Sequence, residues 1–241
     1  MSATMPTTSD MAKIKQPALS LQQAAGTSAA AIQSAVDAYR ADLGTLNPNQ
    51  PGSVGSGRRE INWDGVPDQF AAPNLLPADF FNVNSPRGVV FATRGSGFQV
   101  SANTGAEAEF GNLNPAYPDQ FQTFSPRRLF TALGSRVLIV RFFVPGSTTL
   151  ATTNGFGAVF TDVDLPGTRI DYLDTHDDVI AGFEVPVSPG AQSLSFLGVR
   201  FHEVRIATVR ITSGTVIPGR DEGRNRDAVV MDDFIYGEPI A

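Results

Sequence analysis

Short stretches of alternating apolar and polar residues, separated by turn sequences, run through the C-terminal half of the chain. From Arg136 onward the turn signals VPGS, LPGT, DTHDD and SPGAQ recur, about every 8–15 residues, which is the spacing of strands in a two-sheet sandwich or barrel. No helical pattern interrupts residues 135–241. A parallel α/β sheet, which needs helices between its strands, is therefore not expected.

The strand pattern extends upstream of this half, less regularly. We predict an all-β fold, an antiparallel two-sheet jelly-roll-like sandwich formed by residues 57–239 as one domain, with a short N-terminal helical leader. Residues 103–126 are predicted to form a long loop, either functional or packed against the domain. The expected strands cover residues 59–64, 80–83, 87–94, 97–102, 137–144, 157–164, 169–173, 179–187, 193–201, 204–213 and 228–236, with 87–94 and 97–102 as a hairpin.

The first 56 residues have a different composition. Residues 1–27 are rich in Ser, Thr, Ala and Gln, which predicts a disordered leader. Residues 28–44 are predicted to form an amphipathic helix that begins at the capping residue Ser28 and stops at Gly44. Residues 45–56 are expected to be a linker. One face of the helix carries Ile32, Val36, Tyr39 and Leu43. This face is expected to dock on its own domain, the alternative being a partner chain.

Charge and cysteine content exclude several kinds of protein. The formal net charge is −6, which argues against a nucleic-acid binder, since such proteins carry a basic surface. The chain has no cysteine, so disulfides and thiolate metal sites are excluded. No segment approaches the roughly 20 apolar residues of a membrane span. The first residues lack the apolar core of a signal peptide.

Acidic residues at expected strand ends predict a calcium site. Calcium takes six to eight oxygen ligands, several of them carboxylates. Asp162 and Asp164 flank one residue and would point to the same side of a strand. Asp64 ends the first expected strand, and Asp232 and Asp233 lie near the end of the last. These five residues form the predicted metal site. The alternative is that they cap turns and pair with arginines such as Arg59, Arg169 or Arg210.

Motifs of catalysis are sparse. The only histidines are His176 and His202, and no G-x-S-x-G sequence occurs, so a nucleophilic triad is not expected. A glycosidase needs two carboxylates at a controlled separation, which a sequence cannot measure. No catalytic residues are predicted. The single tryptophan, Trp63, is interpreted as a core residue rather than an exposed sugar-stacking platform.

Six sequence blocks within residues 57–239 carry a resemblance to a known family. The blocks are GRREINWDGVPD, NVNSPRGVVFATRGSGFQVSA, FTALGSRV, GFGAVFTDVDL, LSFLGVRF and VVMDDFIYGEP. Together they resemble a family of uncharacterised, mostly exported bacterial β-sandwich proteins, some of which carry a PEP-CTERM sorting tail. This chain ends at GEPIA without such a tail. The resemblance implies a jelly-roll-like fold outside the cytoplasm and supplies no reaction.

Three functional hypotheses follow. The first is a non-catalytic extracellular or cell-surface binding or adhesive module, stabilised by calcium and binding a glycan. The second is a structural subunit of a homomeric assembly, in which copies are joined through the N-terminal leader or an edge strand. The third is a glycan hydrolase. An exposed concave site that combines aromatic and polar residues would favour the first, and a leader lying on another copy would favour the second.

Overall fold

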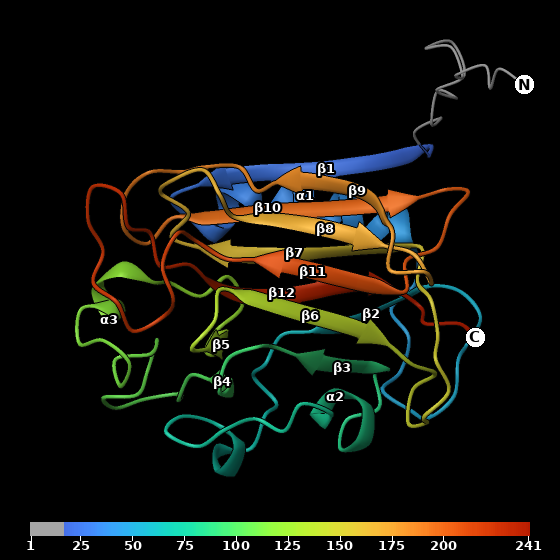
Figure 1. The fold of residues 1–241 in the computed structure, drawn as a ribbon, viewed down its shortest axis with the longest axis horizontal. Coiled ribbons are helices and arrows are strands. Elements are labelled where there is room, and N and C mark those ends of the chain that lie inside the picture. The colour runs from blue at the N-terminus through green and yellow to red at the C-terminus, as the bar shows by residue number, and fades with distance from the viewer. Residues whose placement is uncertain (1–16) are drawn as a thin grey trace, which may run out of the picture.

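Two antiparallel sheets packed face to face make up most of the molecule (Figure 1). The computed structural model describes residues 17–241. The strands of sheet A lie in the order β1-β10-β7-β12-β5-β4, with β2 also paired to β12, and those of sheet B in the order β3-β6-β11-β8-β9. The bounds are β1 Leu19–Gly26, α1 Ala29–Leu43, β2 Arg58–Ile61, α2 Phe80–Val83, β3 Val89–Ala92, β4 Gly97–Val100, α3 Tyr117–Gln120, β5 Phe130–Leu133, β6 Val137–Phe142, β7 Gly155–Thr161, β8 Arg169–Leu173, β9 Val179–Glu184, β10 Leu194–Phe201, β11 Thr208–Thr212 and β12 Val230–Gly237, with one 3-10 turn at Asp68–Phe70.

The last eight strands have the order of a jelly roll. Strands β5, β12, β7 and β10 are neighbours in sheet A, and β6, β11, β8 and β9 are neighbours in sheet B. The chain therefore changes sheet at most connections, as in a pair of Greek keys. This arrangement confirms the predicted all-β, two-sheet sandwich. It also brings the β7–β8, β9–β10 and β11–β12 loops to one end of the sandwich.

Sheet A is covered on both faces, which explains why its central strands show no alternation in burial. Every residue of β7 and of β12 is buried. The inner face contributes to the main core between the sheets. On the outer face α1 packs against Val159, Phe196 and Ile235, and the 103–126 loop packs through Phe110 and its neighbours. That loop was expected to be functional or packed, and it is packed.

The leader is part of the fold, contrary to the expected disorder. Residues 19–26 form β1, which pairs along its whole length with β10, from Leu19 opposite Phe201 to Gly26 opposite Leu194. Its small and polar side chains lack strand alternation, so its pairing is set by β10 and not by its own sequence. Residues 1–16 of the predicted disordered leader lie outside the described residues. The predicted helix is confirmed as α1, and its apolar face docks on its own domain.

Glycines in sheet A allow α1 to lie close to the strands. Gly157 and Gly198 face each other across the β7–β10 pair. A Cβ atom at Gly198 would lie 2.8 Å from Cγ of Tyr39, and one at Gly157 would lie 2.9 Å from Cε1 of the same ring. The Tyr39 hydroxyl donates a hydrogen bond to the carbonyl of Val199 at 3.0 Å. The aromatic ring thus occupies the space that two side chains would otherwise fill.

Two local predictions upstream are wrong. The expected hairpin does not form, because β3 pairs with β6 in sheet B whereas β4 pairs with β5 in sheet A. Between them the chain crosses from one sheet to the other through Gly97, whose φ of 145° is accessible to glycine. The expected strand at residues 80–83 is the helical turn α2. Phe80 and Phe81 are both buried. An apolar pair of this kind fits a strand and a helical turn equally well, so hydrophobicity alone does not separate the two conformations.

The expected linker at residues 45–56 is irregular but held in place. Arg59, which is fully buried, donates hydrogen bonds to the carbonyls of Pro48 and Gly52 at 2.9 and 3.1 Å. Its guanidinium also meets both carboxylate oxygens of Glu238 at 2.7 and 2.9 Å. The same carboxylate accepts hydrogen bonds from Asn47 and from the backbone of Val54. This segment is therefore anchored to the end of β12.

Candidate functional site

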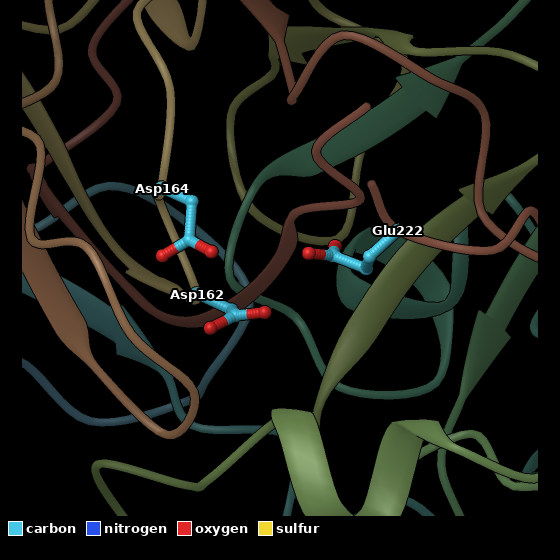
Figure 2. A group of neighbouring side chains, drawn as sticks. All are labelled: Asp162, Asp164 and Glu222. Carbon is cyan, nitrogen blue, oxygen red and sulfur yellow. The ribbon is translucent and has the colours of Figure 1, made fainter. Parts of the chain in front are cut away.

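Three carboxylates meet at the end of the sandwich where the loops converge (Figure 2). Asp162 and Asp164 belong to the β7–β8 loop and Glu222 to the β11–β12 loop, and one ligand atom from each lies within 4.8 Å of the other two. Strand β7 ends at Thr161 and Asp162 has a φ of 65°, so the loop, not strand alternation, brings the two aspartates together. We call Asp162, Asp164 and Glu222, with the neighbouring Asp227, the carboxylate cluster.

Burial and mutual repulsion raise the pKa values of the cluster. Loss of hydration is the largest cause for Asp162, followed by the charges of Glu222, Asp164 and Asp227, and its pKa rises to about 8. Desolvation and the charges of Asp227 and Asp164 raise the pKa of Glu222 to about 7, against a backbone hydrogen bond from Ala228 that lowers it. Desolvation and Asp164 raise that of Asp227 to about 6, against backbone hydrogen bonds that lower it. A nearby cation would therefore favour the charged forms of these carboxyl groups.

The cluster leaves buried oxygen atoms without partners. Asp162 is 1% exposed and Asp227 is 0% exposed, and the Oδ1 atom of each has no hydrogen bond in the described part of the chain. Among residues 17–241, no lysine or arginine forms an ion pair with any of the four carboxylates. Unpaired buried carboxylate oxygens are costly. A bound cation would satisfy them.

The geometry fits a hard divalent cation. Oxygens that bind one calcium ion at about 2.4 Å lie at most about 4.8 Å apart, which is the limit that Asp162, Asp164 and Glu222 meet. Backbone N–H groups hold two of these carboxylates, Gly190 donating to Asp164 Oδ1 at 2.7 Å and Ala228 donating to Glu222 Oε1 at 2.7 Å. These bonds orient the carboxylates. Waters or carbonyls would complete the six to eight ligands.

The other three predicted metal ligands lie elsewhere and make protein hydrogen bonds. Asp64 accepts the backbone N–H groups of Arg127 and Arg128 at 2.5 and 3.1 Å. A β-bulge sets Asp232 and Asp233 together opposite Val159, since Met231 pairs with Phe160 and Phe234 with Ala158. The five expected carboxylates thus occupy two places. The arginines proposed as alternative partners are also engaged elsewhere, Arg59 with Glu238 and both Arg169 and Arg210 with Asp171.

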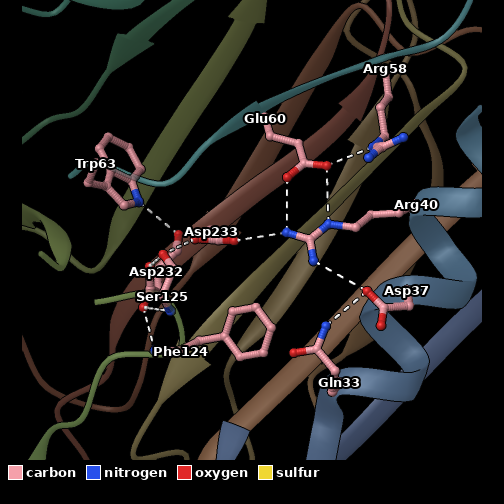
Figure 3. Close-up of polar contacts among 10 residues, drawn as sticks. All are labelled: Gln33, Asp37, Arg40, Arg58, Glu60, Trp63, Phe124, Ser125, Asp232 and Asp233. Carbon is pink, nitrogen blue, oxygen red and sulfur yellow. Dashed lines mark hydrogen bonds and ion pairs between the residues drawn. The ribbon is translucent and has the colours of Figure 1, made fainter. Parts of the chain in front are cut away.

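The bulge places two buried carboxylates side by side (Figure 3). Ser125 donates from its hydroxyl group, which lies 2.6 Å from Asp233 Oδ1 and 3.3 Å from Asp232 Oδ1. Asp232 also accepts the backbone N–H groups of Phe124 and Ser125. Arg40 of α1 reaches Asp233 at 3.3 Å and Glu60 at 2.9 Å. This network ties α1, β2 and the segment before β5 to β12, and its aspartates are 0% and 2% exposed.

The buried pair predicts a pH-dependent stability. Desolvation, followed by the charge of Asp233, raises the pKa of Asp232 well above its usual range, whereas an unfolded aspartate titrates near pH 3.9. The folded state therefore holds a proton more tightly. The stability this gives is present below about pH 4 and is lost as pH rises through the folded pKa. Asp232→Asn should be more stable than the wild type between pH 5 and 8. The difference should grow by up to about 1.4 kcal/mol for each pH unit over which the folded wild type binds one more proton than the unfolded chain.

Urea unfolding at constant calcium concentration measures this difference. Asp37→Asn is the control, because Asp37 contacts the same Arg40 from an exposed position on α1. Its pH profile should run parallel to that of the wild type. If the stability of Asp232→Asn also follows the same pH profile as the wild type, then the folded Asp232–Asp233 pair binds no more protons than the unfolded chain.

The remaining candidates are structural. Trp63 is confirmed as a core residue, 1% exposed and stacked on Phe130 with ring centroids 4.0 Å apart. In the loop at residues 174–178, Asp174 accepts the backbone N–H groups of His176 and Asp178, which forms a turn and lowers the pKa of Asp174. Glu222 and Asp227 were missed as site residues because they alternate with arginines in a loop that reads as a solvated surface.

Comparison of the chain with protein-family models, with curated proteins and with solved structures found no match. In the part of the chain that the structure describes, no helix is long and apolar enough to span a membrane.

Proposed function

We propose that this protein is a non-catalytic binding module that works outside the cytoplasm and is stabilised by calcium. The observation that carries the proposal is the carboxylate cluster, in which ligand atoms of Asp162, Asp164 and Glu222 lie within 4.8 Å of one another and the buried Oδ1 of Asp162 has no hydrogen-bond partner in the described chain. The sequence resemblance to exported β-sandwich proteins supports the same location. Burial of so much negative charge without a cation would destabilise this end of the fold.

A calcium ion would act here by holding loops together. Its ligands come from the β7–β8 and β11–β12 loops, and Asp164 is already joined to the β9–β10 loop through Gly190. Sites in extracellular modules bind calcium with dissociation constants of about 10⁻⁴–10⁻³ M, so such a site fills where calcium is millimolar. This is the physical reason for placing the module outside the cytoplasm.

Calcium should raise the melting temperature. An ion that binds only the folded state stabilises it by about 2.7 kcal/mol at a hundredfold excess over the dissociation constant, which corresponds to about 5–10 °C for a domain of this size. Differential scanning fluorimetry with calcium, with chelator and with sodium at equal ionic strength measures the effect. Sodium should not reproduce it.

Two substitutions test whether the calcium response depends on the carboxylate cluster or on acidic residues in general. Asp162→Asn should abolish the calcium response and, in chelator, should melt above the wild type, because a buried carboxyl group with a raised pKa destabilises the folded state at neutral pH and an amide does not. Asp174→Asn, in the β8–β9 turn, should keep the full response. The proposal fails if chelator and calcium leave the wild-type melting curve unchanged.

A homomeric assembly is the second candidate. Strand β1 lies at the edge of sheet A and pairs within the described chain with β10 alone. Its outer backbone groups could pair with a second copy, as exposed edge strands do. Helix α1 packs on its own domain. Two copies could therefore pair through β1 without exchanging their N-terminal segments. Sedimentation analysis of the wild type and of Gln23→Pro, a change in the middle of β1, tests this candidate.

A further inference from the structure

A hollow away from the carboxylate cluster combines aromatic and polar side chains. It lies between the segment after β2 and the segment around α2, and its volume is about 370 Å³, in the range of small-ligand sites. We call it the Arg87 pocket. Its lining includes one arginine and no carboxylate, although the whole chain carries a net charge of −6. Its lining includes Asn62, Gln69, Phe70, Asn84, Ser85 and Arg87.

The guanidinium of Arg87 has no anionic partner in the described chain. It lies over the Phe81 ring at 5.2 Å, and its Nη1 donates to the hydroxyl group of Ser85. Its Nε atom makes no hydrogen bond. Burial, together with the positive charge of nearby Arg59, lowers the pKa of Arg87. Arg59 is itself neutralised by Glu238. Arg87 is thus a half-buried cation that would gain from an anion.

Other groups around Arg87 suit a hydroxylated ligand. The side chains of Asn62, Gln69 and Asn84 are exposed and make no hydrogen bond to another residue within residues 17–241. Each amide offers a donor and an acceptor, which is what a sugar hydroxyl group needs. Phe70 is half-buried and packs edge-on against Phe80, with ring centroids 5.5 Å apart. It adds an apolar wall against which the C–H face of a sugar ring can lie.

We propose that the Arg87 pocket binds a uronic acid unit of an acidic glycan, with Arg87 taking the carboxylate and the three amides taking hydroxyl groups. Arginine pairs with carboxylates through two parallel hydrogen bonds, and this geometry favours them over uncharged groups. The proposal depends on the binding role proposed above but not on calcium, because no residue of the carboxylate cluster lines the pocket. It names the glycan class that the module would recognise.

The single tryptophan offers a direct readout. Trp63 lines the pocket and is the only tryptophan of the chain. Titration of the full chain with galacturonic acid and with its short oligomers should therefore change the tryptophan emission. Galactose and acetate are the comparison ligands, because one lacks the carboxylate and the other lacks the hydroxyl groups. Each of them should bind at least tenfold more weakly than the galacturonate oligomers.

Substitutions test whether galacturonate binds in the Arg87 pocket or elsewhere on the protein. Arg87→Gln should weaken galacturonate binding at least tenfold, while Arg94→Gln, the same change at an exposed position outside the pocket, should leave it unaltered. Asn84→Ala, an exposed change, should weaken binding of the oligomers several-fold without a loss of folding. Each titration is followed by nuclear magnetic resonance and by circular dichroism of the same samples.

The outcomes distinguish this proposal from the calcium proposal. Saturable galacturonate binding that is lost in Arg87→Gln supports the pocket whether or not calcium shifts the melting temperature. Equal binding of galactose, equal binding of acetate, or no change in either emission or resonance spectra with galacturonate would overturn the assignment. Binding that survives in Arg87→Gln would overturn it as well. A calcium response in the same preparation would then still support the carboxylate cluster.

Discussion

Tyr39→Ala should lower the free energy of unfolding by about 3–5 kcal/mol, the range found for a large buried aromatic side chain. The ring packs against Phe196 with centroids 5.7 Å apart, and it fills the space above Gly157 and Gly198. Its removal leaves a cavity between α1 and sheet A and takes one hydrogen-bond donor from the carbonyl of Val199. Urea denaturation followed by circular dichroism measures the change.

Gly198→Ala tests the same contact from the strand. The added Cβ would lie 2.8 Å from Tyr39 Cγ and 2.8 Å from Phe196 Cζ, so both rings must move. Combining it with Tyr39→Ala should cost less than the sum of the two single changes, because one of the two clashing rings is then absent. Ser34→Ala, on the exposed face of α1, is the control and should change stability by less than about 0.5 kcal/mol.

These experiments decide whether the leader is dispensable. From the sequence, residues 1–27 were expected to be a disordered leader, which implies that they can be removed without loss of folding. The structure instead makes α1 the cover of a buried sheet face. If Tyr39→Ala costs less than about 1 kcal/mol and a chain that begins at Gly44 still folds cooperatively, α1 is only loosely attached and the expectation of a separable leader holds.

Arg59→Met should cost about 3–5 kcal/mol, as expected when one partner of a buried ion pair is removed. Glu238 would remain at 2% exposure without its main partner. The carbonyls of Pro48, Gly52 and Pro86 would also lose donors. Chemical denaturation measures the loss. Limited proteolysis should show new cleavage within residues 45–56, because this segment is held mainly by these contacts.

The double variant Arg59→Met/Glu238→Leu should recover much of the stability, since it removes both buried charges. Arg169→Met is the matched control. That side chain lies on the outer face of sheet B, 39% exposed, and its partner Asp171 retains Arg210. Its cost should stay below about 1 kcal/mol. A similar small cost for Arg59→Met would mean that the buried pair contributes little to the fold.

The parts of the fold that the sequence predicts are those in which a strand carries its own pattern. In β11, Val209 and Ile211 are buried while Arg210 lies outward, so alternation is visible in the sequence. Strand β8 begins and ends at the expected residues, Arg169 and Leu173. Strand β1 was missed for the opposite reason. Its residues LSLQQAAG have no such pattern, and only the distant β10 makes them a strand.

The candidate site was predicted in part for a related reason. The spacing of Asp162 and Asp164 is visible in the sequence, although a turn at Asp162 and not a strand produces their proximity. Glu222 comes from a loop about 60 residues away in the chain, and only the jelly-roll order brings it to the same end. The bulge that joins Asp232 to Asp233 has no sequence signal of its own, since it depends on the register against β7.

The pairing of β1 with β10 has a consequence for the order of folding. Leu19 is made early and its partner Phe201 late, and β2 likewise waits for β12. Contacts between residues so far apart in the chain require a large loop to close first, which slows folding. During synthesis, which proceeds from the N-terminus, the first two strands of sheet A therefore have no partners until the last third of the chain is present. Local pairs such as β4 with β5 can form before that time, but α1 has no completed sheet to cover, so its docking is expected among the last steps.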